Sequence, residues 1–317
     1  MTYTEVEIKI IEYSSIICST ISFISCMFIG LSWVCFHDLR TFAYSLVMCA
    51  GMSSLVRSFS KMWGSLNTGT VACEIQGHLT TFGGIAQFSW ISVIAIVMFT
   101  LTFYTDFWLV TDEIKWKRLY KWIIIIFSIA FISGLIPVFT KSYGNVGGWC
   151  WIVNTTTIDN ILRWILFYIW NVISVCLCVY IYIRLHFYFK KVTQPELEDS
   201  ISDSKTDIKD DYDNENDNDN SRSFNKLYSK IKYYPLALII GYTIPTFNRI
   251  INIFMDVPFG LQLIQAITTG LFGFILCIIY GISPAVIHQY KRVLYKRRGI
   301  SDINDDRQNI NSTTETV

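Results

Sequence analysis

Apolar residues along this chain gather into seven long stretches with polar breaks between them. A helix needs ~20 mostly apolar residues to cross the ~30 Å of hydrocarbon in a bilayer, and each stretch is close to that length or longer. The pattern therefore predicts an all-α membrane protein, a seven-transmembrane helix bundle over residues 16–287. The predicted spans are Ile16–Phe36, Phe42–Trp63, Cys73–Phe103, Trp122–Phe139, Ile161–Phe187, Tyr233–Met255 and Gly260–Ile287.

The overall composition supports this interpretation. Hydrophobic residues make up 52% of the 317 residues and charged residues only 16%, whereas about 25% of a typical soluble domain is charged. An ordinary soluble protein is therefore disfavoured.

Lysine and arginine are divided unevenly between the two sets of loops. One set holds almost all of them, at Arg40, at 115–121, at 190–232 and from 291 onward. The other set holds only Lys9 and Lys141. Cytoplasmic loops retain positive charge, so the N-terminus, residues 1–15, is predicted outside and the C-terminus inside. Residues 1–15 lack the basic region of a cleaved signal peptide, so the first span is expected to insert as the membrane anchor itself.

Two segments differ from the spans in composition. Residues 194–221 contain eleven Asp or Glu residues and very few apolar ones, which predicts a disordered acidic cytoplasmic loop between the fifth and sixth spans. After Pro284, apolar Ile287, Tyr290 and Leu294 recur at helical spacing beside many cations. This pattern predicts an amphipathic helix on the inner leaflet, so that residues 288–317 form a cytoplasmic helix and a disordered tail.

Cysteine positions separate into two groups. Seven of the nine fall within spans, where a thiol acts as a small apolar residue. Cys73 opens the third span and Cys150 lies in the second outer loop, both on the exported side, and a disulfide between them would pin that loop over the bundle. The four histidines are scattered over both faces, so no metal site is predicted. Asn154 begins a glycosylation pattern, Asn-Thr-Thr, on the outer side.

Ionisable residues inside spans are costly and usually face a cavity or a partner. Four cations fall in the outer half of the bundle: Arg57, Lys61, Arg163 and Arg249. Arg57 and Lys61 are four residues apart and so share one helix face. Neutral amides lie towards the same end, at Gln76, Asn248, Gln262 and Gln265. The excess of positive charge predicts a site for a small anion, which guanidinium can bind with two hydrogen bonds.

An alternative without a ligand also fits these charges. Arg57 could pair with Glu74, and Arg249 could pair with Asp256, so that the outer mouth is neutralised internally. Two prolines are candidate hinges, Pro245 in the sixth span and Pro284 near the inner end of the seventh, because proline removes a helix hydrogen bond.

Three short motifs carry a family resemblance. They are ACEIQG at Ala72–Gly77, GGWCWI at Gly147–Ile152 and TFNRI at Thr246–Ile250. Together they resemble the slime-mould cyclic AMP receptors and their cyclic-AMP-receptor-like relatives, over roughly Ile11 to Tyr295. The resemblance implies a multi-pass G-protein-coupled receptor of the plasma membrane. It also implies a bonded Cys73–Cys150 pair.

The partners implied are an extracellular small molecule, a heterotrimeric G protein and the lipid bilayer; neither a nucleic acid nor a cofactor is expected. The ligand-binding residues expected from the charge pattern are Arg57, Lys61, Gln76, Arg163, Asn248, Arg249 and Gln265. The founding receptors have long serine-rich tails, whereas this tail is short, so the receptor-like branch fits better. Cyclic AMP is then one candidate ligand among small anions.

Other functions for a seven-helix protein are less consistent with the residues. A retinal protein needs a lysine in the seventh helix, and Gly260–Ile287 has none. An intramembrane hydrolase needs clustered acids or histidines at one depth, which the spans lack, so no enzymatic activity is predicted. A small-molecule transporter is the remaining alternative, although the two halves of the chain show no internal repeat.

Overall fold

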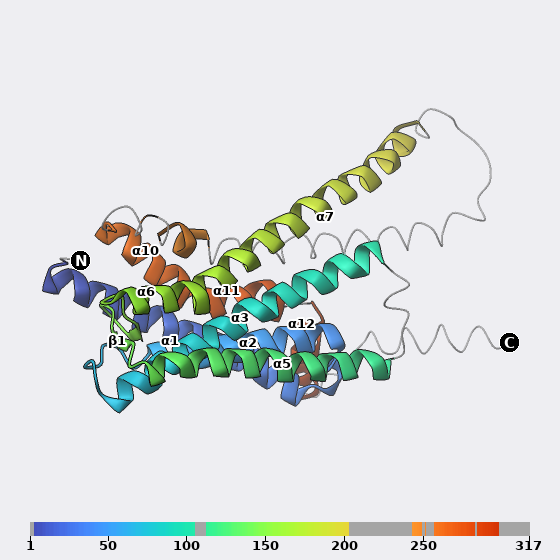
Figure 1. The fold of residues 1–317 in the computed structure, drawn as a ribbon. Coiled ribbons are helices and arrows are strands. Elements are labelled where there is room, and N and C mark those ends of the chain that lie inside the picture. The colour runs from blue at the N-terminus through green and yellow to red at the C-terminus, as the bar shows by residue number, and fades with distance from the viewer. Residues whose placement is uncertain are drawn as a thin grey trace.

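The computed structural model describes residues 3–104, 112–202, 243–248, 251, 257–282 and 284–297. Long helices run side by side with the N-terminus at one end of the bundle (Figure 1). Among the described residues, five helices are long and apolar enough to cross a membrane, and a bent pair of helices makes a sixth. The chain is thus a multi-pass helical membrane protein. The predicted sixth span, Tyr233–Met255, is described only at 243–248 and 251, where it is helical, so the count of seven stays a prediction.

Helix α1, Glu5–Cys35, begins well before the span predicted at Ile16. Its start is fixed by a capping box, in which the Thr4 hydroxyl accepts from the Glu7 N–H and the Glu7 carboxylate accepts from the Thr4 N–H at 2.8 Å. Hydropathy does not detect this extension because four charged residues interrupt its apolar ones between residues 5 and 12. The capping box satisfies the orphan backbone donors of the first turn.

Helix α3, Val71–Phe103, is the centre of the bundle. It packs against α2, Phe42–Lys61, and α5, Asp112–Phe139, and it also contacts α7, Ile169–Ser202. Thr41 caps α2 and Thr70 caps α3 through their side-chain oxygens. These helices begin at or before the predicted spans, because caps and polar first turns add residues outside the hydrocarbon.

The fifth predicted span is a composite helix. It consists of α6, Thr157–Arg163, a π-helical turn at Trp164–Tyr168, and α7, Ile169–Ser202. Helix α7 therefore continues into the acidic segment that was predicted to be disordered from residue 194. Once a helix is nucleated each further residue adds a hydrogen bond, and Leu and Glu are good helix formers. The rest of the acidic segment lies outside the described residues.

The seventh predicted span is broken. Helix α10, Phe259–Gly270, and the helical segment Phe272–Ile279, which starts as α11, Phe272–Leu276, meet at 45°. A π-helical turn at Cys277–Gly281 includes the last residues of this segment. Helix α12, Pro284–Arg297, begins after it. Pro284 starts a new helix, a position that proline favours, and its role as a hinge stays a prediction. A further bend lies between Gly270 and Phe272.

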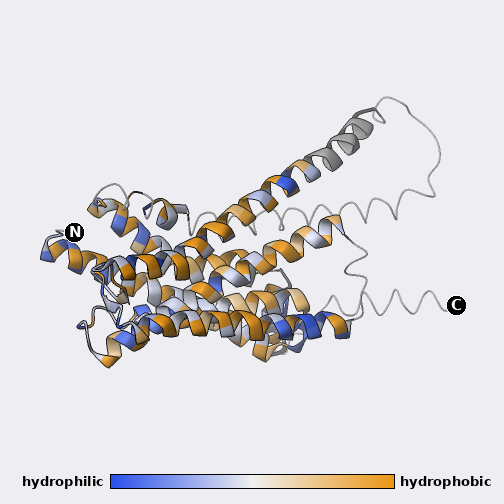
Figure 2. Cartoon of the chain, in the orientation of Figure 1, coloured by the Kyte–Doolittle hydropathy of each residue, from blue (hydrophilic) through white to orange (hydrophobic). Residues whose placement is uncertain are grey.

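Helix α12 docks at the opposite end of α1 from the capping box. The Tyr290 ring contacts Phe28 and Phe36 at centroid distances of 5.4 and 4.8 Å, and its hydroxyl lies 3.1 Å from the Ser32 hydroxyl. This end of the bundle, which we call the basic end, also carries the cationic first turns of α5, which are hydrophilic in Figure 2. The amphipathic helix expected after Pro284 is thus present as α12.

Small residues allow the helices to approach closely, as is common in membrane bundles. A Cβ on Gly83 of α3 would lie 2.8 Å from the backbone N of Arg57 and 2.9 Å from the Ser53 carbonyl oxygen in α2. Across the bundle, the Ser22 hydroxyl of α1 donates to the Gly270 carbonyl oxygen at the bend. The position of Arg57 therefore depends on the glycine opposite it.

We expect Gly83→Ala to lower the free energy of unfolding by about 1–3 kcal/mol, because the clash is with backbone that cannot rotate away. Gly260→Ala is the matched control, since a Cβ there meets nothing within 4 Å and alanine favours the helix by up to about 1 kcal/mol. Thermal unfolding of the purified variants measures both effects. Equal midpoints for the two variants would contradict the packing account.

Candidate functional site

A short β-hairpin covers the end of the bundle where the N-terminus lies, which we call the hairpin end (Figure 1). Strands β1, Tyr143–Asn145, and β2, Cys150–Ile152, pair antiparallel, with Asn145 opposite Cys150. The turn between them closes with a hydrogen bond from the Val146 N–H to the Trp149 carbonyl oxygen at 3.0 Å. Its central residues are Gly147 and Gly148, which both have positive φ, a conformation that glycine adopts most easily.

The hairpin is bound to α3 by covalent and polar contacts. Cys73 and Cys150 form a disulfide, which confirms the predicted pair. One turn along α3, the fully buried Gln76 accepts from the Cys150 N–H at 2.8 Å and donates to the Ser60 and Gly64 carbonyl oxygens at 2.9 and 2.8 Å. Gln76 therefore joins β2, α3 and the end of α2 in one hydrogen-bonded unit.

Tyr143 anchors the other strand. Its hydroxyl donates to the Gly134 carbonyl oxygen at 2.8 Å and lies 3.2 Å from the Thr81 hydroxyl. Burial raises the pKa of this phenol, so it stays protonated and keeps its hydrogen to donate. Its ring occupies the space above Gly77, where any Cβ would clash with it.

Because side chains alternate along an extended chain, Trp149 and Trp151 point away from the disulfide and towards the bundle. The Lys61 ammonium lies 4.3 Å from the centroid of the Trp149 ring, and the Arg163 guanidinium lies 5.0 Å from that of Trp151. Both arrangements are cation–π contacts. Lys61 also donates to the Thr269 hydroxyl of α10 at 3.0 Å, and Arg163 donates to the Ile152 carbonyl oxygen.

Arg57 reaches deeper into the bundle than either of these cations. Its Nη1 donates to the Gln87 side-chain oxygen at 3.1 Å, and the Gln87 amide donates to the Ser54 hydroxyl at 3.2 Å. Glu74 lies thirteen residues before Gln87 in α3, about 20 Å away along the helix axis. The alternative in which Arg57 pairs with Glu74 is therefore wrong.

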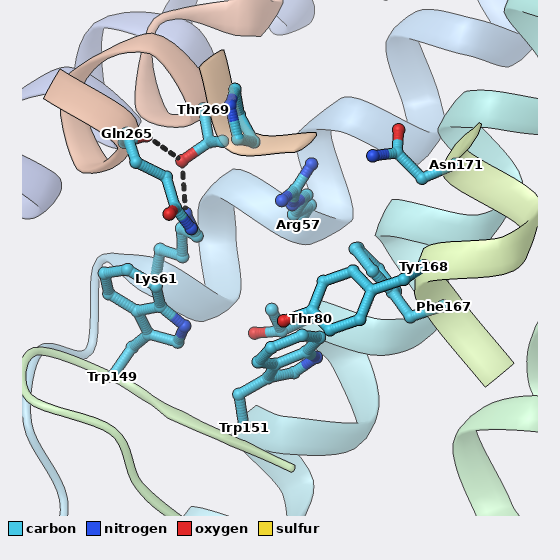
Figure 3. A pocket seen from close by; sticks show the side chains of 11 residues that line it. Arg57, Lys61, Thr80, Trp149, Trp151, Phe167, Tyr168, Asn171, Gln265 and Thr269 are labelled. Atoms are coloured by element: carbon cyan, nitrogen blue, oxygen red, sulfur yellow. Dashed lines mark hydrogen bonds between the residues drawn. The ribbon is translucent and has the colours of Figure 1, made fainter. Parts of the chain in front are cut away.

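These side chains surround one cavity of about 30 Å³. Figure 3 shows Arg57 and Lys61 reaching into it from α2, the two tryptophans from the hairpin, and aromatic side chains from the π-helical turn. It is lined by Arg57, Lys61, Thr80, Trp149, Trp151, Phe167, Tyr168, Asn171, Pro245, Gln265 and Thr269. The volume suits one or two water molecules, so the site is closed in this conformation.

The structure brings together part of the predicted site. Arg57, Lys61 and Gln265 line the cavity, while Arg163 adjoins it through Trp151. Gln76 instead holds the hairpin, and the buried Asn248 donates to the side-chain oxygens of Gln262 and Gln265. Arg249 lies outside the described residues.

Several residues that line the cavity or hold Arg57 were not singled out from the sequence. Trp149 and Trp151 belong to a motif that was noted only for its resemblance. Asn171, inside the fifth span, and Gln87, the partner of Arg57 in the third, are polar residues at membrane depth, a signal that could have found both. Phe167 and Tyr168 could not be found this way, because the π-helical turn that directs them has no sequence pattern here.

Asp159, an acidic residue at this level, belongs to the capping box of α6. Its carboxylate accepts from the Thr155 hydroxyl at 2.9 Å and from the N–H of the cap residue Thr156 at 3.0 Å. Asp256 lies outside the described residues. Within the described part of the chain, no group of His, Cys, Asp or Glu could hold a metal ion. The cavity offers guanidinium, ammonium, amide and hydroxyl donors, a set suited to an anion.

The outer loop also carries the predicted glycosylation pattern. Asn154 is exposed between β2 and α6. Its modification stays a prediction.

Three known receptors are similar to this chain. An ascaroside receptor of Arthrobotrys oligospora is 27% identical over 193 residues, which is 56% of this chain and 44% of that protein. G-protein coupled receptor 1 of Arabidopsis thaliana is 26% identical over 286 residues, covering 88% of this chain and 78% of the relative. Cyclic AMP receptor-like protein A of Dictyostelium discoideum is 23% identical over 288 residues, covering 89% and 66%.

No family model matches the chain. The similarity to these receptors confirms the resemblance indicated by the three short motifs, and two of the matches extend over most of the bundle. The chain spans only about 44% of the ascaroside receptor and 66% of the cyclic AMP receptor-like protein.

We expect Cys73→Ser to destabilise the protein by about 2–4 kcal/mol, the usual contribution of a disulfide. Gln76→Leu should also destabilise it, because the Cys150 N–H and two carbonyl oxygens lose their partner in a buried place. Thermal unfolding and surface expression of each variant measure these effects. A mass spectrum of the unreduced protein that shows free thiols at both cysteines would contradict the first expectation.

Proposed function

We propose that this protein is a G-protein-coupled receptor of the plasma membrane that binds an extracellular small molecule carrying a negative charge and signals to a heterotrimeric G protein. The observation that carries the proposal is the convergence of Arg57 and Lys61 on one cavity beneath the hairpin, with Arg163 beside it. Similarity to three receptors supports the receptor role.

Two independent properties support the proposed orientation in the membrane. Disulfides persist in oxidising compartments, which supports an extracellular position for the hairpin end with Cys73 and Cys150. Cationic loops favour the cytoplasm, which supports a cytoplasmic position for the basic end and α12. The cavity then faces the outside, and the ends of α5 and α7 face the G protein.

The chemistry of the cavity narrows the ligand class. A phosphate or carboxylate could accept hydrogen bonds from Arg57 and Lys61, and the indole rings of Trp149 and Trp151 offer apolar faces for the rest of the molecule. Two of the relatives are named for different ligands, an ascaroside and cyclic AMP, and the third for none, so their names do not select one. Cyclic AMP and other small organic anions are all candidates.

Binding such a molecule requires the cavity to expand. A volume of about 30 Å³ is far below the ~300–1,000 Å³ of typical ligand sites. The hairpin is held by the disulfide and Gln76, so the proposed hinge is Pro245, which lines another wall of the cavity. Proline weakens a helix locally, and outward movement at this hinge would couple ligand entry to the cytoplasmic end.

A nucleotide-exchange assay tests the proposed function. Membranes that contain the receptor and a heterotrimeric G protein are screened with cyclic nucleotides, other organic phosphates and organic carboxylates. We expect at least one anion to stimulate GTP exchange, whereas neutral analogues do not. Uptake of the anion by vesicles without any exchange would instead identify a transporter.

Arg57→Lys should weaken the response to the active anion, because the charge stays but the planar fork is lost. Arg57→Met should weaken it further, by ~2–5 kcal/mol if a charge-assisted contact is lost from a dry pocket. Dose–response curves for GTP exchange measure both, with surface expression as the control for folding.

The double variant Arg57→Met with Glu74→Gln separates ligand binding from internal charge pairing. Since Glu74 lies far along α3 from the Arg57 contact with Gln87, the second change should restore nothing. Full recovery of signalling in the double variant would overturn the assignment of Arg57 to the ligand site.

A further inference from the structure

A second cavity lies at the basic end of the bundle, far from the hairpin. Its volume is about 430 Å³, and it lies between the start of α2, the last third of α3 and the early turns of α5. The lining residues are Phe42, Leu46, Val93, Ile96, Val97, Thr100, Arg118, Leu119 and Trp122. All three helices contribute residues from the same end of the bundle, so the cavity lies near that surface of the membrane.

The wall of this cavity is amphipathic. Seven of the nine lining residues that the structure describes are aliphatic or aromatic, and Arg118 is the one charged residue among these nine. Arg118 is half-buried and stands one turn before Trp122 on α5, so both can face the same space. An occupant must therefore combine a long apolar part with a negatively charged group.

Neighbouring residues of α5 indicate that Arg118 lies at the membrane interface. Trp116 and Tyr120 are exposed on the same turns, and such aromatic residues concentrate at headgroup level. Lys115, Lys117 and Lys121 surround them in the sequence. Basic clusters at this depth attract anionic lipids and enrich them around the helix.

We propose that this cavity binds one anionic phospholipid of the leaflet at the basic end, with an acyl chain among the apolar residues and its phosphate on Arg118. An inorganic anion cannot fill an apolar space of this size, and a sterol has no charge for the guanidinium. By contacting α2, α3 and α5 together, the bound lipid stabilises their packing.

Native mass spectrometry of the full chain in detergent tests this proposal without any receptor ligand or G protein. The protein is titrated with phosphatidylserine and with phosphatidylcholine of the same acyl chains, and the bound lipid is counted. We expect wild type to bind phosphatidylserine about five-fold more tightly, the effect of one cation near an anionic group. Arg118→Gln should abolish this preference, and Val97→Phe, which fills the cavity, should weaken binding of both lipids.

Lys117→Gln is the matched control. It removes the same charge from the adjacent position, but this side chain is 69% exposed and pairs with Glu113 at 2.7 Å. The change also leaves Glu113 without that cation. If lipid were attracted only by the general positive charge of this end, the preference for phosphatidylserine would therefore fall at least as much in Lys117→Gln as in Arg118→Gln. Equal loss of preference in the two charge variants, or displacement of phosphatidylserine by a sterol, would overturn the proposal.

Discussion

The attachment of the hairpin to the top of α3 is the constraint on which the candidate site depends. The Cys73–Cys150 bond fixes one face of β2, and Gln76 forms hydrogen bonds with the backbone of β2 and of the end of α2. Because side chains alternate along this extended segment, Trp149 and Trp151 lie on the opposite face, next to Lys61 and Arg163. A loop that was free to move could not hold two indole rings over two cations, because the entropy lost on ordering them would exceed what each contact contributes.

Burying cations inside a membrane bundle is costly, and the structure shows how the cost is reduced here. Lys61 is only 2% exposed, yet it has an indole face on one side and the Thr269 hydroxyl on another. Arg57 is positioned by close packing of α2 on Gly83 and by the side chain of Gln87. Such partners orient each cation within the bundle. Cations held in fixed positions around one cavity are what the proposed anion site requires.

The length of the apolar stretches was enough to predict the membrane-spanning helices that the structure describes, because hydrocarbon thickness imposes a length that any span must meet. The polar start of α1 and the helical beginning of the acidic segment were missed, since capping and propagation act outside the hydrocarbon. The break at Gly270 was also missed, because glycine is common in membrane helices and its effect depends on the neighbour that approaches it. For the site, charge pattern identified Arg57 and Lys61. It could not assign Gln76 to the hairpin, because hydrogen-bond partners distant in sequence appear only in three dimensions.

Thermal unfolding of the purified protein in a series of organic anions and their neutral analogues tests the central claim most directly, since it needs no transducer. A ligand at 100 times its dissociation constant stabilises the folded state by about 2.7 kcal/mol. The account predicts that an anion raises the midpoint in wild type and in Lys61→Arg, that its neutral analogue does not, and that Lys61→Met loses the effect. An equal rise with the neutral analogue, or an undiminished rise in Lys61→Met, would contradict a cationic ligand site beneath the hairpin.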